Sequence, residues 1–447
     1  MKGVILAAGR GSRLQPYSQG KPKALVKLLG LTLIERAIYT LKRAGIKDII
    51  IVIGYKGERV KEFLGDASTL GVKLTYVWND EWHKDNGVSL YKVKEYLSPG
   101  ESFILLMVDH VVDPKIISSL KKLDTHKNII CVDKCENKDE RKIQESTKVL
   151  AKGSRVLRIG KRLKEFNYLD CGVFKLNYNV FEKLESLVKN GKDRLAELIQ
   201  ELAHNDELTI YDVNGRLWYD IDTEEDVKII ERELLQSLIK PTDGFISRKL
   251  NRKISIWITK LLVKTSILPS HLSILSFIVA VLSGVAFSMG TWVYSILGGI
   301  FAQLSSIIDS CDGELARLKF RDTPFGAFYD SILDRYADGF ILLGMVIGLL
   351  KIGVHNPIWV IIITCAALIG LPLSMLCKDR YYRLTGAELK SGIASRDIRL
   401  FIIFIFGLLN LNFYAILLIA ILTHLNVLYY FIKVRRVFNM GTVREVV

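Results

Sequence analysis

The uncharged stretch between Lys264 and Asp309 constrains the fold of this 447-residue chain more than any other feature. It contains no Asp, Glu, Lys or Arg, and at roughly 20 residues per span it is long enough to cross a lipid bilayer twice. Similar apolar stretches lie between residues 338 and 378 and between residues 399 and 433. A core helix of a soluble protein has no need of such length. The second half of the chain is therefore predicted to be embedded in a membrane.

The composition changes near Lys240, because residues 1–240 alternate charged and apolar residues as soluble proteins do. We expect three parts: a soluble domain over 1–240, an interfacial linker helix over 241–266 and a transmembrane domain over 267–447. The linker helix is predicted to be amphipathic, since its apolar residues recur on one helical face. These residues are Phe245, Ile246, Leu250, Ile254, Ile258 and Leu261. A plain linker helix is the alternative.

The transmembrane domain is predicted to be all-α, with six spans. They lie roughly at 269–289, 292–316, 326–350, 357–377, 394–410 and 413–432. Basic residues crowd before the first span, between the second and third, between the fourth and fifth, and after the sixth. The other three connections hold only Lys351. The positive-inside rule therefore predicts a multi-pass protein of the cell membrane with both termini in the cytoplasm.

The formal net charge of +15 does not by itself indicate a nucleic-acid partner. Residues 1–240 carry 41 Lys and Arg against 35 Asp and Glu, which is close to balance. Most of the basic residues that follow sit at the ends of apolar spans, where they orient a membrane protein and meet anionic headgroups. We therefore expect contact with membrane lipid and no binding of nucleic acid.

Four aspartates are predicted to meet at the cytoplasmic ends of the second and third spans. Asp309 and Asp312 are spaced i, i+3, and Asp330 and Asp334 are spaced i, i+4, so each pair shares one helical face. Carboxylates grouped at membrane depth are costly unless cations compensate them. Oxygen-rich sites of this kind suit Mg²⁺ or Mn²⁺. The spacing predicts a divalent metal centre, with a structural ion-pair network or a cation path as the alternatives.

The pattern DxxDGxxAR…GxxxDxxxD, which runs from Asp309 to Asp334, resembles the signature of the CDP-alcohol phosphotransferases. This resemblance implies that Asp309, Asp312 and Asp330 bind metals bridging a CDP diphosphate. It implies further that Asp334 is the general base for the attacking hydroxyl and also touches a metal. The signature residues expected beside the nucleotide are Gly313, Arg317 and Gly326.

Basic residues on the same cytoplasmic side are candidates for binding the phosphate of an acceptor. They are Lys378, Arg383, Arg396 and Arg399. Each of them, taken singly, is explained equally well as a positive-inside flanking residue. Asp338 lies one further turn along the face of Asp334, and the sequence assigns it no role.

The N-terminal residues form a short apolar strand, a glycine-rich turn and a basic segment. The turn reads Ala7-Ala8-Gly9-Arg10-Gly11-Ser12-Arg13-Leu14, and the segment reads Lys21-Pro22-Lys23-Ala24-Leu25. Such a turn can wrap a triphosphate with its backbone amides while Arg13 and Lys23 neutralise charge. The arrangement AAGxGxRL…KPKxL resembles the opening of sugar-nucleotidyltransferase-like enzymes. It lacks the third glycine of a dinucleotide fingerprint and the lysine of a Walker sequence.

Strand-like runs at 49–53 and 103–108 alternate with helical patterns, which indicates a parallel sheet covered by helices. We therefore expect an α/β Rossmann-like nucleotidyltransferase domain followed by the six-helix transmembrane domain. Asp109 follows the second run, at the end of a strand where such sheets bind ligands. The family resemblance implies that Asp109 holds Mg²⁺ together with Asp220 or Asp222, and the sequence leaves that choice open.

Further residues of the soluble domain follow from the same resemblance. Asn86 and Gly87 resemble the loop that reads the nucleotide base. Lys148 and Asp170 are candidate contacts to a polyol phosphate and its hydroxyls, with a purely structural role as the alternative. The backbone of Ala7, Ala8, Gly9 and Gly11 is expected beside the phosphates. The catalytic side chains of this domain are then Lys23 and Arg13.

The two resemblances imply a shared intermediate: the first half is expected to make a CDP-alcohol, and the second half is expected to consume it. Their fusion resembles the bifunctional inositol-1-phosphate cytidylyltransferase/di-myo-inositol-phosphate-phosphate synthase family over nearly the whole chain. The resemblance implies that CTP and inositol-1-phosphate give CDP-inositol, which reacts with a second inositol-1-phosphate and releases CMP. A phospholipid-forming enzyme is the nearer alternative, and a nucleotide-sensing cation transporter is the more distant one. The sequence leaves the oligomeric state open, with a homodimer among the options.

Overall fold

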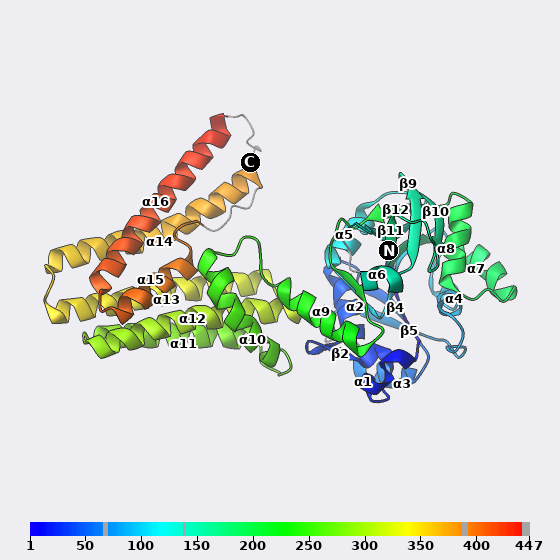
Figure 1. Cartoon of the computed structure of the whole chain (residues 1–447), viewed down its shortest axis with the longest axis horizontal. Helices are drawn as coiled ribbons and strands as arrows, with labels where there is room; N and C mark the ends of the chain where they lie inside the picture. Colours follow the sequence, from blue (N-terminus) through cyan, green and yellow to red (C-terminus); the bar gives the residue numbers. More distant parts are fainter. Residues whose placement is uncertain (66–69, 137–139, 387–391, 440–447) are drawn as a thin grey trace. The chain divides into compact units, whose positions relative to one another are not determined.

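The computed structural model describes residues 1–65, 70–136, 140–386 and 392–439. Contacts divide the chain into two compact units, Met1–Arg232 and Glu233–Val447. The N-terminal unit mixes strands and helices, and the described residues of the C-terminal unit form helices and their connections (Figure 1). The finer boundaries predicted from the sequence, at 240 and 266, stay predictions.

A nine-stranded mixed sheet forms the centre of the N-terminal unit, in the order β5-β4-β1-β6-β11-β8-β12-β10-β9. In chain order the strands are β1 (Lys2–Ala7), β4 (Asp48–Ile53), β5 (Lys73–Trp78), β6 (Ser102–Met107), β8 (Asn128–Lys134), β9 (Lys148–Lys152), β10 (Arg155–Gly160), β11 (Tyr168–Asn177) and β12 (Leu208–Asp212). Two small ribbons accompany the sheet, β2 (Lys27–Leu28) with β3 (Leu31–Thr32) and β7 (His110–Val112) with β13 (Trp218–Asp220).

The first four strands of that order are parallel, and their direction determines where the glycine-rich turn and Asp109 lie. β1 pairs in parallel register with β4 and β6, and β4 pairs with β5. Ile49 to Ile53 are all buried, as expected of strands covered on both faces. The carboxyl ends of β1 and β6 lead directly into the glycine-rich turn and into Asp109. The sheet thus brings both sequence motifs to the same edge.

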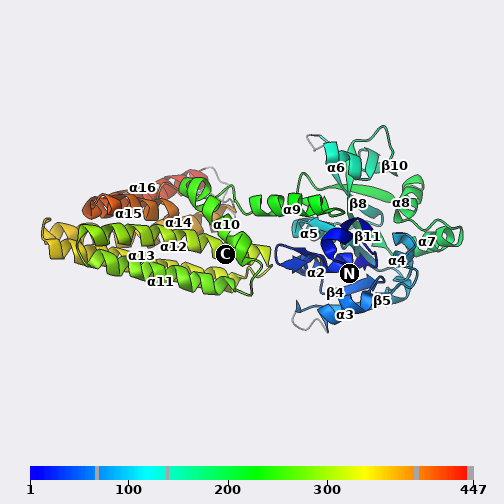
Figure 2. The ribbon, with the colours of Figure 1, turned by 60° about the horizontal axis from the view of Figure 1, so that its bottom comes forward.

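Helices cover this sheet. Those of the N-terminal unit are α1 (Gln15–Ser18), α2 (Leu33–Arg43), α3 (Gly57–Leu64), α4 (Asn86–Tyr91), α5 (Pro114–Lys122), α6 (Glu140–Glu145), α7 (Val180–Lys189) and α8 (Leu195–His204). α9 (Glu224–Gln236) crosses the boundary between the units. α4, α7 and α8 pack together, and α8 also packs on β10 (Figure 2). Thr32 caps α2 through a reciprocal bond with Glu35, the capping-box arrangement.

The helices of the C-terminal unit are α10 (Arg252–Leu262), α11 (Pro269–Ser288), α12 (Trp292–Leu318), α13 (Pro324–Ile352), α14 (Pro357–Thr385), α15 (Arg396–Leu408) and α16 (Asn412–Asn439). Four of them, among the described residues, are long and apolar enough to cross a membrane: α11, α12, α14 and α16. α13 is long enough but is not among these apolar helices, since it carries Asp330, Asp334, Arg335 and Asp338 in its first half and Lys351 near its end. α15 has 13 residues, which makes it only about 20 Å long.

α11, α12 and α13 lie side by side in both ribbon views (Figures 1 and 2). α11 and α13 approach so closely that no side chain fits between their backbones at Gly284 and Gly344. A Cβ atom on Gly344 would overlap the carbonyl oxygen of Gly284, and one on Gly348 would overlap the carbonyl oxygen of Phe287. Glycine at these positions is what lets the two helices cross in direct backbone contact.

α10 carries its apolar and polar residues on opposite faces. Ile254, Trp257 and Leu261 are 40%, 65% and 54% exposed, whereas Ser255 and Thr259 are fully buried. The apolar face is therefore the outward one. This arrangement is the reverse of a helix on a soluble protein and is typical of a helix that faces lipid.

Candidate active sites

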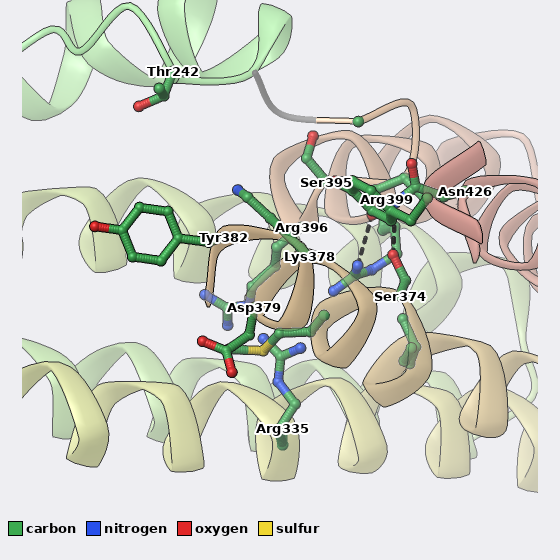
Figure 3. Close-up of a pocket in the computed structure, with 15 residues that line it drawn as sticks. Thr242, Arg335, Ser374, Lys378, Asp379, Tyr382, Ser395, Arg396, Arg399 and Asn426 are labelled. Carbon is green, nitrogen blue, oxygen red and sulfur yellow. Dashed lines mark hydrogen bonds between the residues drawn. The ribbon is translucent and has the colours of Figure 1, made fainter. Parts of the chain in front are cut away.

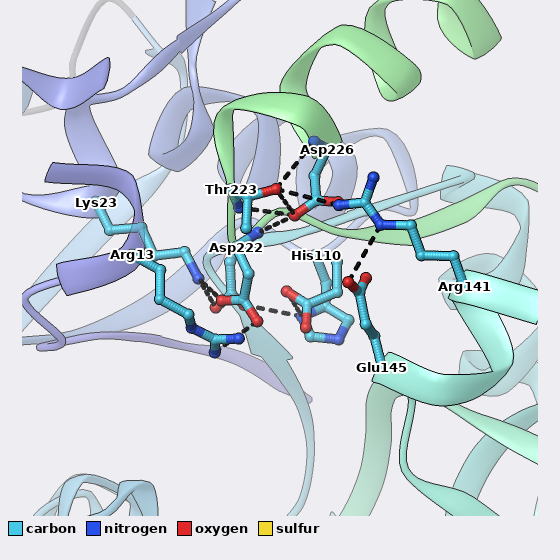
Figure 4. Close-up of polar contacts among 10 residues, drawn as sticks. Arg13, Lys23, His110, Arg141, Glu145, Asp222, Thr223 and Asp226 are labelled. Carbon is cyan, nitrogen blue, oxygen red and sulfur yellow. Dashed lines mark hydrogen bonds and ion pairs between the residues drawn. The ribbon is translucent and has the colours of Figure 1, made fainter. Parts of the chain in front are cut away.

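Lys23 joins the glycine-rich turn to two aspartates at the edge of the sheet (Figure 4). Its Nζ lies 2.6 Å from Oδ2 of Asp109 and 2.8 Å from Oδ1 of Asp222. Arg13 Nη2 lies 2.6 Å from Oδ2 of Asp222. Gly11 has a φ of +63°, and a Cβ atom there would lie 2.7 Å from Cβ of Lys23. Glycine at position 11 is therefore needed for the turn to pass over the lysine.

Asp220 occupies a different position from Asp222. It ends β13, which pairs with β7 and so places Asp220 opposite His110. Asp109, His110 and Asp220 each offer one donor atom within 4.8 Å of the others. Nδ1 of His110 lies 2.8 Å from Oδ1 of Asp109. In the part of the chain that the structure describes, the buried Oδ1 of Asp220 has no hydrogen-bond partner.

The electrostatics separate these groups further. Burial acts to raise the pKa of Asp109, but Lys23 and His110 outweigh it and hold that pKa well below its usual range. Burial raises the pKa of Asp220 to about 6, with the negative charges of Asp109 and Asp222 adding to it. Burial also raises the pKa of Asp170 to about 6. The charged forms of Asp220 and Asp170 are therefore poorly compensated, as expected where a cation or a ligand donor supplies the balance.

Asp226 organises the loop that carries Asp222, a role that the sequence interpretation missed. Its side chain is 1% exposed, and Oδ2 accepts hydrogen bonds from the backbone nitrogens of Asp222 (3.0 Å) and Thr223 (2.7 Å). Oδ1 accepts from Nη2 of Arg141 at 3.1 Å (Figure 4). The spacing Thr223-x-x-Asp226 at the start of the charged helix α9 resembles a capping box, and this spacing could have been recognised in the sequence.

A cavity of about 340 Å³ opens beside these groups. Its wall carries the carboxylates of Asp109, Asp170, Asp220 and Asp222 together with the cations Arg13 and Lys161. Lys148 is not part of this wall; its Nζ donates to the carbonyl oxygen of Lys161 at 3.0 Å. The cavity can accept a ligand that carries both phosphate and hydroxyl groups.

The remaining predicted nucleotide contacts surround the same edge. Asn86 lines the cavity and its Oδ1 accepts from the backbone nitrogen of Leu195 at 2.9 Å. A Cβ atom on Gly87 would lie 2.5 Å from the carbonyl oxygen of Asp193, so the loop packs tightly there. Ala7 ends β1 and Ala8 follows it, and Gly9 faces open space, since a Cβ there would meet nothing within 4 Å. The turn is thus open on the side where a phosphate would approach.

The C-terminal unit holds a second carboxylate cluster where α12 and α13 meet. Asp309, Asp330 and Asp334 each offer one oxygen within 4.8 Å of the others. Asp312 is 7% exposed and accepts a hydrogen bond from the hydroxyl of Ser273 on α11. Its carboxyl group also lies within hydrogen-bonding reach of Asp330. The structure brings together all four aspartates that the sequence pattern singled out.

Arg396, the first residue of α15, closes this cluster on one side. Its Nη1 lies 2.8 Å from Oδ2 of Asp309 and 2.7 Å from Oδ1 of Asp334. Its Nε lies 3.3 Å from Oδ1 of Asp338, whose other oxygen lies 2.8 Å from Nη2 of Arg399. Asp338, which had no role in the sequence interpretation, thus anchors both arginines.

A larger cavity, of about 510 Å³, lies on the other side of Arg396 (Figure 3). Its cationic wall consists of Arg335, Lys378, Arg396 and Arg399. Three of these were predicted, and Arg335 was missed because it directly follows Asp334 and gave no separate signal. Arg383 does not line the cavity; its Nε pairs with Oδ2 of Asp379, one turn earlier, at 2.9 Å.

The signature glycines and Arg317 lie close to the cluster in sequence but differ in surroundings. A Cβ atom on Gly313 would lie 3.2 Å from Nη1 of Arg317, so the glycine leaves room for the guanidinium. Arg317 donates to the carbonyl oxygen of Leu238 at 3.5 Å, and its buried Nε has no partner among the described residues. Gly326 is exposed at the start of α13, where its nitrogen donates to Oγ1 of Thr323 at 3.0 Å.

Glu314 ties α10 to the helix that carries Asp309 and Asp312. It is fully buried and accepts from Nη1 of Arg252 (2.6 Å), Oγ of Ser255 (2.6 Å) and Oγ1 of Thr259 (2.7 Å). The sequence interpretation missed this contact because position 314 is variable in the signature pattern. Three side chains on the polar face of α10 thus donate hydrogen bonds to this one buried carboxylate.

Both clusters suit a divalent metal. Each consists mainly of carboxylate oxygens, the donors that Mg²⁺ and Mn²⁺ prefer. The orphaned oxygen of Asp220 is an unused acceptor in the first cluster. In the second, the charge of the four aspartates exceeds what Arg396 and Arg335, which lies 3.7 Å from Oδ2 of Asp334, neutralise. The residues present therefore fit a metal ion in each unit.

Comparison with known families divides the chain in the same two parts. The family model for nucleotidyl transferases matches residues 2–237, and the model for CDP-alcohol phosphatidyltransferases matches residues 266–430. The nucleotidyltransferase-like fold of the first unit and the transferase character of both units are thereby established.

Relatives with both parts are also found. The chain is 35% identical over 439 residues to "Bifunctional IPC transferase and DIPP synthase" of Aquifex aeolicus, covering 95% of this chain and 96% of that protein. It is 34% identical over 453 residues to the protein of that name from Thermococcus kodakarensis, covering 97% of each. A solved structure, "Structure of the inositol-1-phosphate CTP transferase from T. maritima", matches 52% of this chain and 93% of its own, at 25% identity and a TM-score of 0.47.

Proposed function

Since the chain belongs to the family of bifunctional IPC transferases and DIPP synthases, we propose that it makes and then consumes CDP-inositol. The N-terminal unit joins CTP and inositol-1-phosphate and releases pyrophosphate. The C-terminal unit transfers phosphoinositol from CDP-inositol to a second inositol-1-phosphate and releases CMP. The observation that carries this proposal is that each unit holds its own carboxylate cluster beside its own cavity. Arg13 and Lys161 line the cavity of the N-terminal unit, and four basic side chains line the cavity of the C-terminal unit.

In the first reaction, Asp109 and Asp220 are proposed to hold Mg²⁺, which when bound neutralises the phosphate charge. Oδ1 of Asp220 supports this choice, because it has no hydrogen-bond partner among the described residues and lies 4.0 Å from Nδ1 of His110, whereas Asp222 pairs closely with Lys23 and Arg13. An oxygen of inositol-1-phosphate attacks the α-phosphorus of CTP, and the bond to pyrophosphate breaks. Lys23 stabilises the charge that develops on the phosphates. Asp222 positions Lys23 and Arg13 for that role.

The nucleotide is proposed to lie against the open turn, with backbone amides of the segment 7–11 on its phosphates. Asn86 and Gly87 would hold the base. For the polyol phosphate, Asp170 is retained as a contact to hydroxyl groups because it lines the cavity. Lys161 replaces Lys148 as the candidate phosphate contact, since Lys161 lies on the cavity wall and Lys148 does not.

In the second reaction, Asp309, Asp312 and Asp330 are proposed to hold a divalent metal, with Asp334 beside them. When bound, this metal would neutralise the charge of the CDP diphosphate. Asp334 removes the proton of the acceptor hydroxyl. The hydroxyl oxygen then attacks the phosphorus that carries inositol, the bond to CMP breaks, and CMP leaves. Gly313, Arg317 and Gly326 are proposed to face the CDP portion.

The acceptor phosphate is proposed to bind in the cationic cavity, held by Arg335, Lys378 and Arg399. Arg396 separates this cavity from the carboxylate cluster and contacts both. An acceptor whose phosphate lies in the cavity would therefore reach the general base Asp334 past Arg396. Arg383 is left out of this set because Asp379 already holds it.

We further propose that all six helices α11–α16 cross the cell membrane, with α10 in the cytoplasmic interface and both termini in the cytoplasm. Four of the helices have the length and composition of membrane spans. The charged residues in the first half of α13 do not face lipid alone: Asp330 and Asp334 belong to the carboxylate cluster, and Asp338 pairs with Arg396 and Arg399. The exposed apolar face of α10 suits an interface with anionic lipid.

The test is a product analysis of the purified full chain in detergent, incubated with CTP, Mg²⁺ and inositol-1-phosphate and followed by phosphorus NMR. We expect pyrophosphate and CDP-inositol first, then CMP and a soluble phosphodiester. A parallel incubation with CDP-inositol and a lipid alcohol should yield no CMP. Absence of pyrophosphate would show that inositol-1-phosphate is the wrong alcohol, and CMP release to lipid alone would favour a phospholipid-forming enzyme.

A further inference from the structure

The cationic cavity of the C-terminal unit has a second, neutral wall. Next to Arg399, α14 and α16 contribute Ser374 and Asn426 to this wall (Figure 3). An acceptor phosphate accounts for the cations, but its oxygens accept hydrogen bonds and so offer nothing to a second acceptor such as the carbonyl oxygen of an asparagine. The neutral wall therefore points to a second feature of the ligand.

Asn426 has one polar atom without a hydrogen-bond partner among the described residues. It is 4% exposed, and its Nδ2 donates to Oγ of Ser374 at 2.6 Å. Its Oδ1 is buried and has no partner among residues 1–65, 70–136, 140–386 and 392–439. A buried amide oxygen without a donor is unfavourable in the free protein. A ligand donor in the cavity would satisfy it.

Ser374 complements that oxygen. Its hydroxyl oxygen accepts the bond from Asn426, so its own hydrogen remains to be donated. The pair thus presents one acceptor, Oδ1 of Asn426, and one donor, the hydroxyl of Ser374. An alcohol group both donates and accepts one hydrogen bond, which matches the two atoms of this pair.

The glycine at position 392 keeps the amide oxygen in place. Gly392 also lines the cavity, and a Cβ atom on it would overlap Oδ1 of Asn426. Any other residue there would push the asparagine side chain away from its present position. Glycine at position 392 therefore leaves the space that the amide oxygen of Asn426 occupies.

A second buried asparagine on the same helix shows what a purely structural pair looks like. Asn412, at the start of α16, donates through Nδ2 to Oγ of Ser295 at 2.9 Å. Its Oδ1 lies 3.1 Å from the same hydroxyl, whose single hydrogen can go to this oxygen or to the carbonyl oxygen of Gly407. Both polar atoms of Asn412 thus lie within hydrogen-bond distance of Ser295, and Asn412 lines neither cavity described above. Asn426 differs from it in the one atom that matters for a ligand.

We propose that Asn426 and Ser374 bind a hydroxyl group of the acceptor and so select a phosphorylated polyol over other phosphate-bearing alcohols. This inference rests on the proposed function, because it assigns the neutral wall of the same acceptor cavity. The phosphate is held by the cations, and a ring hydroxyl remote from the phosphate bridges Oδ1 of Asn426 and the hydroxyl of Ser374.

The test combines removal of the side chain with removal of the hydroxyl. CDP-inositol is supplied directly, and CMP release is measured with inositol-1-phosphate and with a series of its monodeoxy analogues. For the unaltered protein, one analogue is expected to lose at least about tenfold in kcat/KM, mainly through KM. In N426L that analogue and inositol-1-phosphate should become nearly equal, because the hydroxyl no longer has a partner. S374A, which barely changes the volume, should show the same loss of discrimination.

N412L is the matched control, since it removes a buried asparagine–serine pair from the same helix. It should keep the full discrimination among the analogues whatever its effect on the yield of folded protein. If N426L and S374A also keep that discrimination, the inference is wrong while the proposed function stands. If the unaltered protein releases no CMP from CDP-inositol with inositol-1-phosphate, the proposed function fails and the inference fails with it.

Discussion

Nη1 of Arg396 lies 2.7 Å from Oδ1 of Asp334, and this ion pair joins the wall of the acceptor cavity to the carboxylate cluster. The same nitrogen contacts Asp309, and Nε of Arg396 contacts Asp338. One guanidinium thus fixes the relative positions of α12, α13 and α15. Its planar, five-donor geometry allows this, and a lysine ammonium could not reach all three carboxylates at once.

R396K is therefore expected to lower CMP release by at least about tenfold, because the lysine keeps the charge and loses the simultaneous contacts. Pyrophosphate release by the N-terminal unit should be unchanged. Steady-state rates of both half-reactions on the same preparation check this. K378R, a change of the same kind at another basic residue of the cavity wall, should have a smaller effect. Equal losses in the two variants would argue against a special role for Arg396.

The two reactions should separate by single substitutions. D334N is expected to abolish CMP release from CDP-inositol and to leave pyrophosphate release intact, because an amide cannot take a proton from the hydroxyl. D109A should do the reverse when CDP-inositol is supplied. Phosphorus NMR of each half-reaction measures both. If either change stopped both reactions in a folded protein, the assignment of one reaction to each unit would be wrong.

Asp220 and Asp222 should respond differently to Mg²⁺. D220N removes a proposed metal ligand, so half-maximal pyrophosphate release is expected to need at least about tenfold more Mg²⁺. D222N leaves the metal ligands and loosens Lys23 and Arg13, so kcat should fall with little change in the Mg²⁺ requirement. Rates measured across a Mg²⁺ titration distinguish the two. The opposite pattern would assign the metal to Asp222.

D226N is expected to slow pyrophosphate release and to destabilise the N-terminal unit by about 1–3 kcal/mol, because the amide presents one acceptor oxygen where the carboxylate uses two. The backbone of Asp222 and Thr223 would lose its fixed position. Urea unfolding and rate measurements check both effects. E225Q is the control, since Glu225 also pairs with Arg141 but is largely exposed. A stability loss in E225Q as large as in D226N would contradict this account.

E314L should be among the most destabilising single changes in the C-terminal unit, by about 3–5 kcal/mol. It leaves Arg252, Ser255 and Thr259 without their shared buried acceptor, although Arg252 keeps its 2.9 Å contact with Asp243. Thermal unfolding in detergent measures the effect. D322N, at an exposed position, should change stability by less than about 0.5 kcal/mol. An unaffected melting transition in E314L would mean that α10 is not held by this carboxylate.

The parts of both sites that repeat at helical or strand spacing could be predicted from the sequence. Asp309, Asp312, Asp330 and Asp334 share helical faces by their spacing alone, and the structure brings them together. Asp109 follows a buried strand, and the sheet order places it beside the glycine-rich turn. Local periodicity fixes such positions because it determines which face a side chain occupies.

The parts that depend on distant packing could not be predicted. Nδ2 of Asn426 donates its hydrogen bond to Ser374, 52 residues away in sequence. The carboxylate of Glu314 accepts its hydrogen bonds from side chains of α10. The proposed choice of Asp220 over Asp222 as a metal ligand rests on the contact of Lys23 with Asp222, which the sequence did not reveal. Arg383 and Lys148 carried the right charge, but each is engaged locally, with Asp379 and with the carbonyl oxygen of Lys161. Charge and spacing do not reveal where a long side chain turns.

The direct backbone contact between Gly284 and Gly344 has a consequence for how the C-terminal unit tolerates heat. A crossing without side chains has no rotamers to populate, so rising temperature gives it little freedom to loosen. Asp330 and Asp334 lie on the same helix as Gly344, ten or more residues before it. Thermal motion at the carboxylate end of α13 is then a rotation about this crossing, and it displaces Asp330 and Asp334 more than the residues beside Gly344, because they lie farther from the crossing.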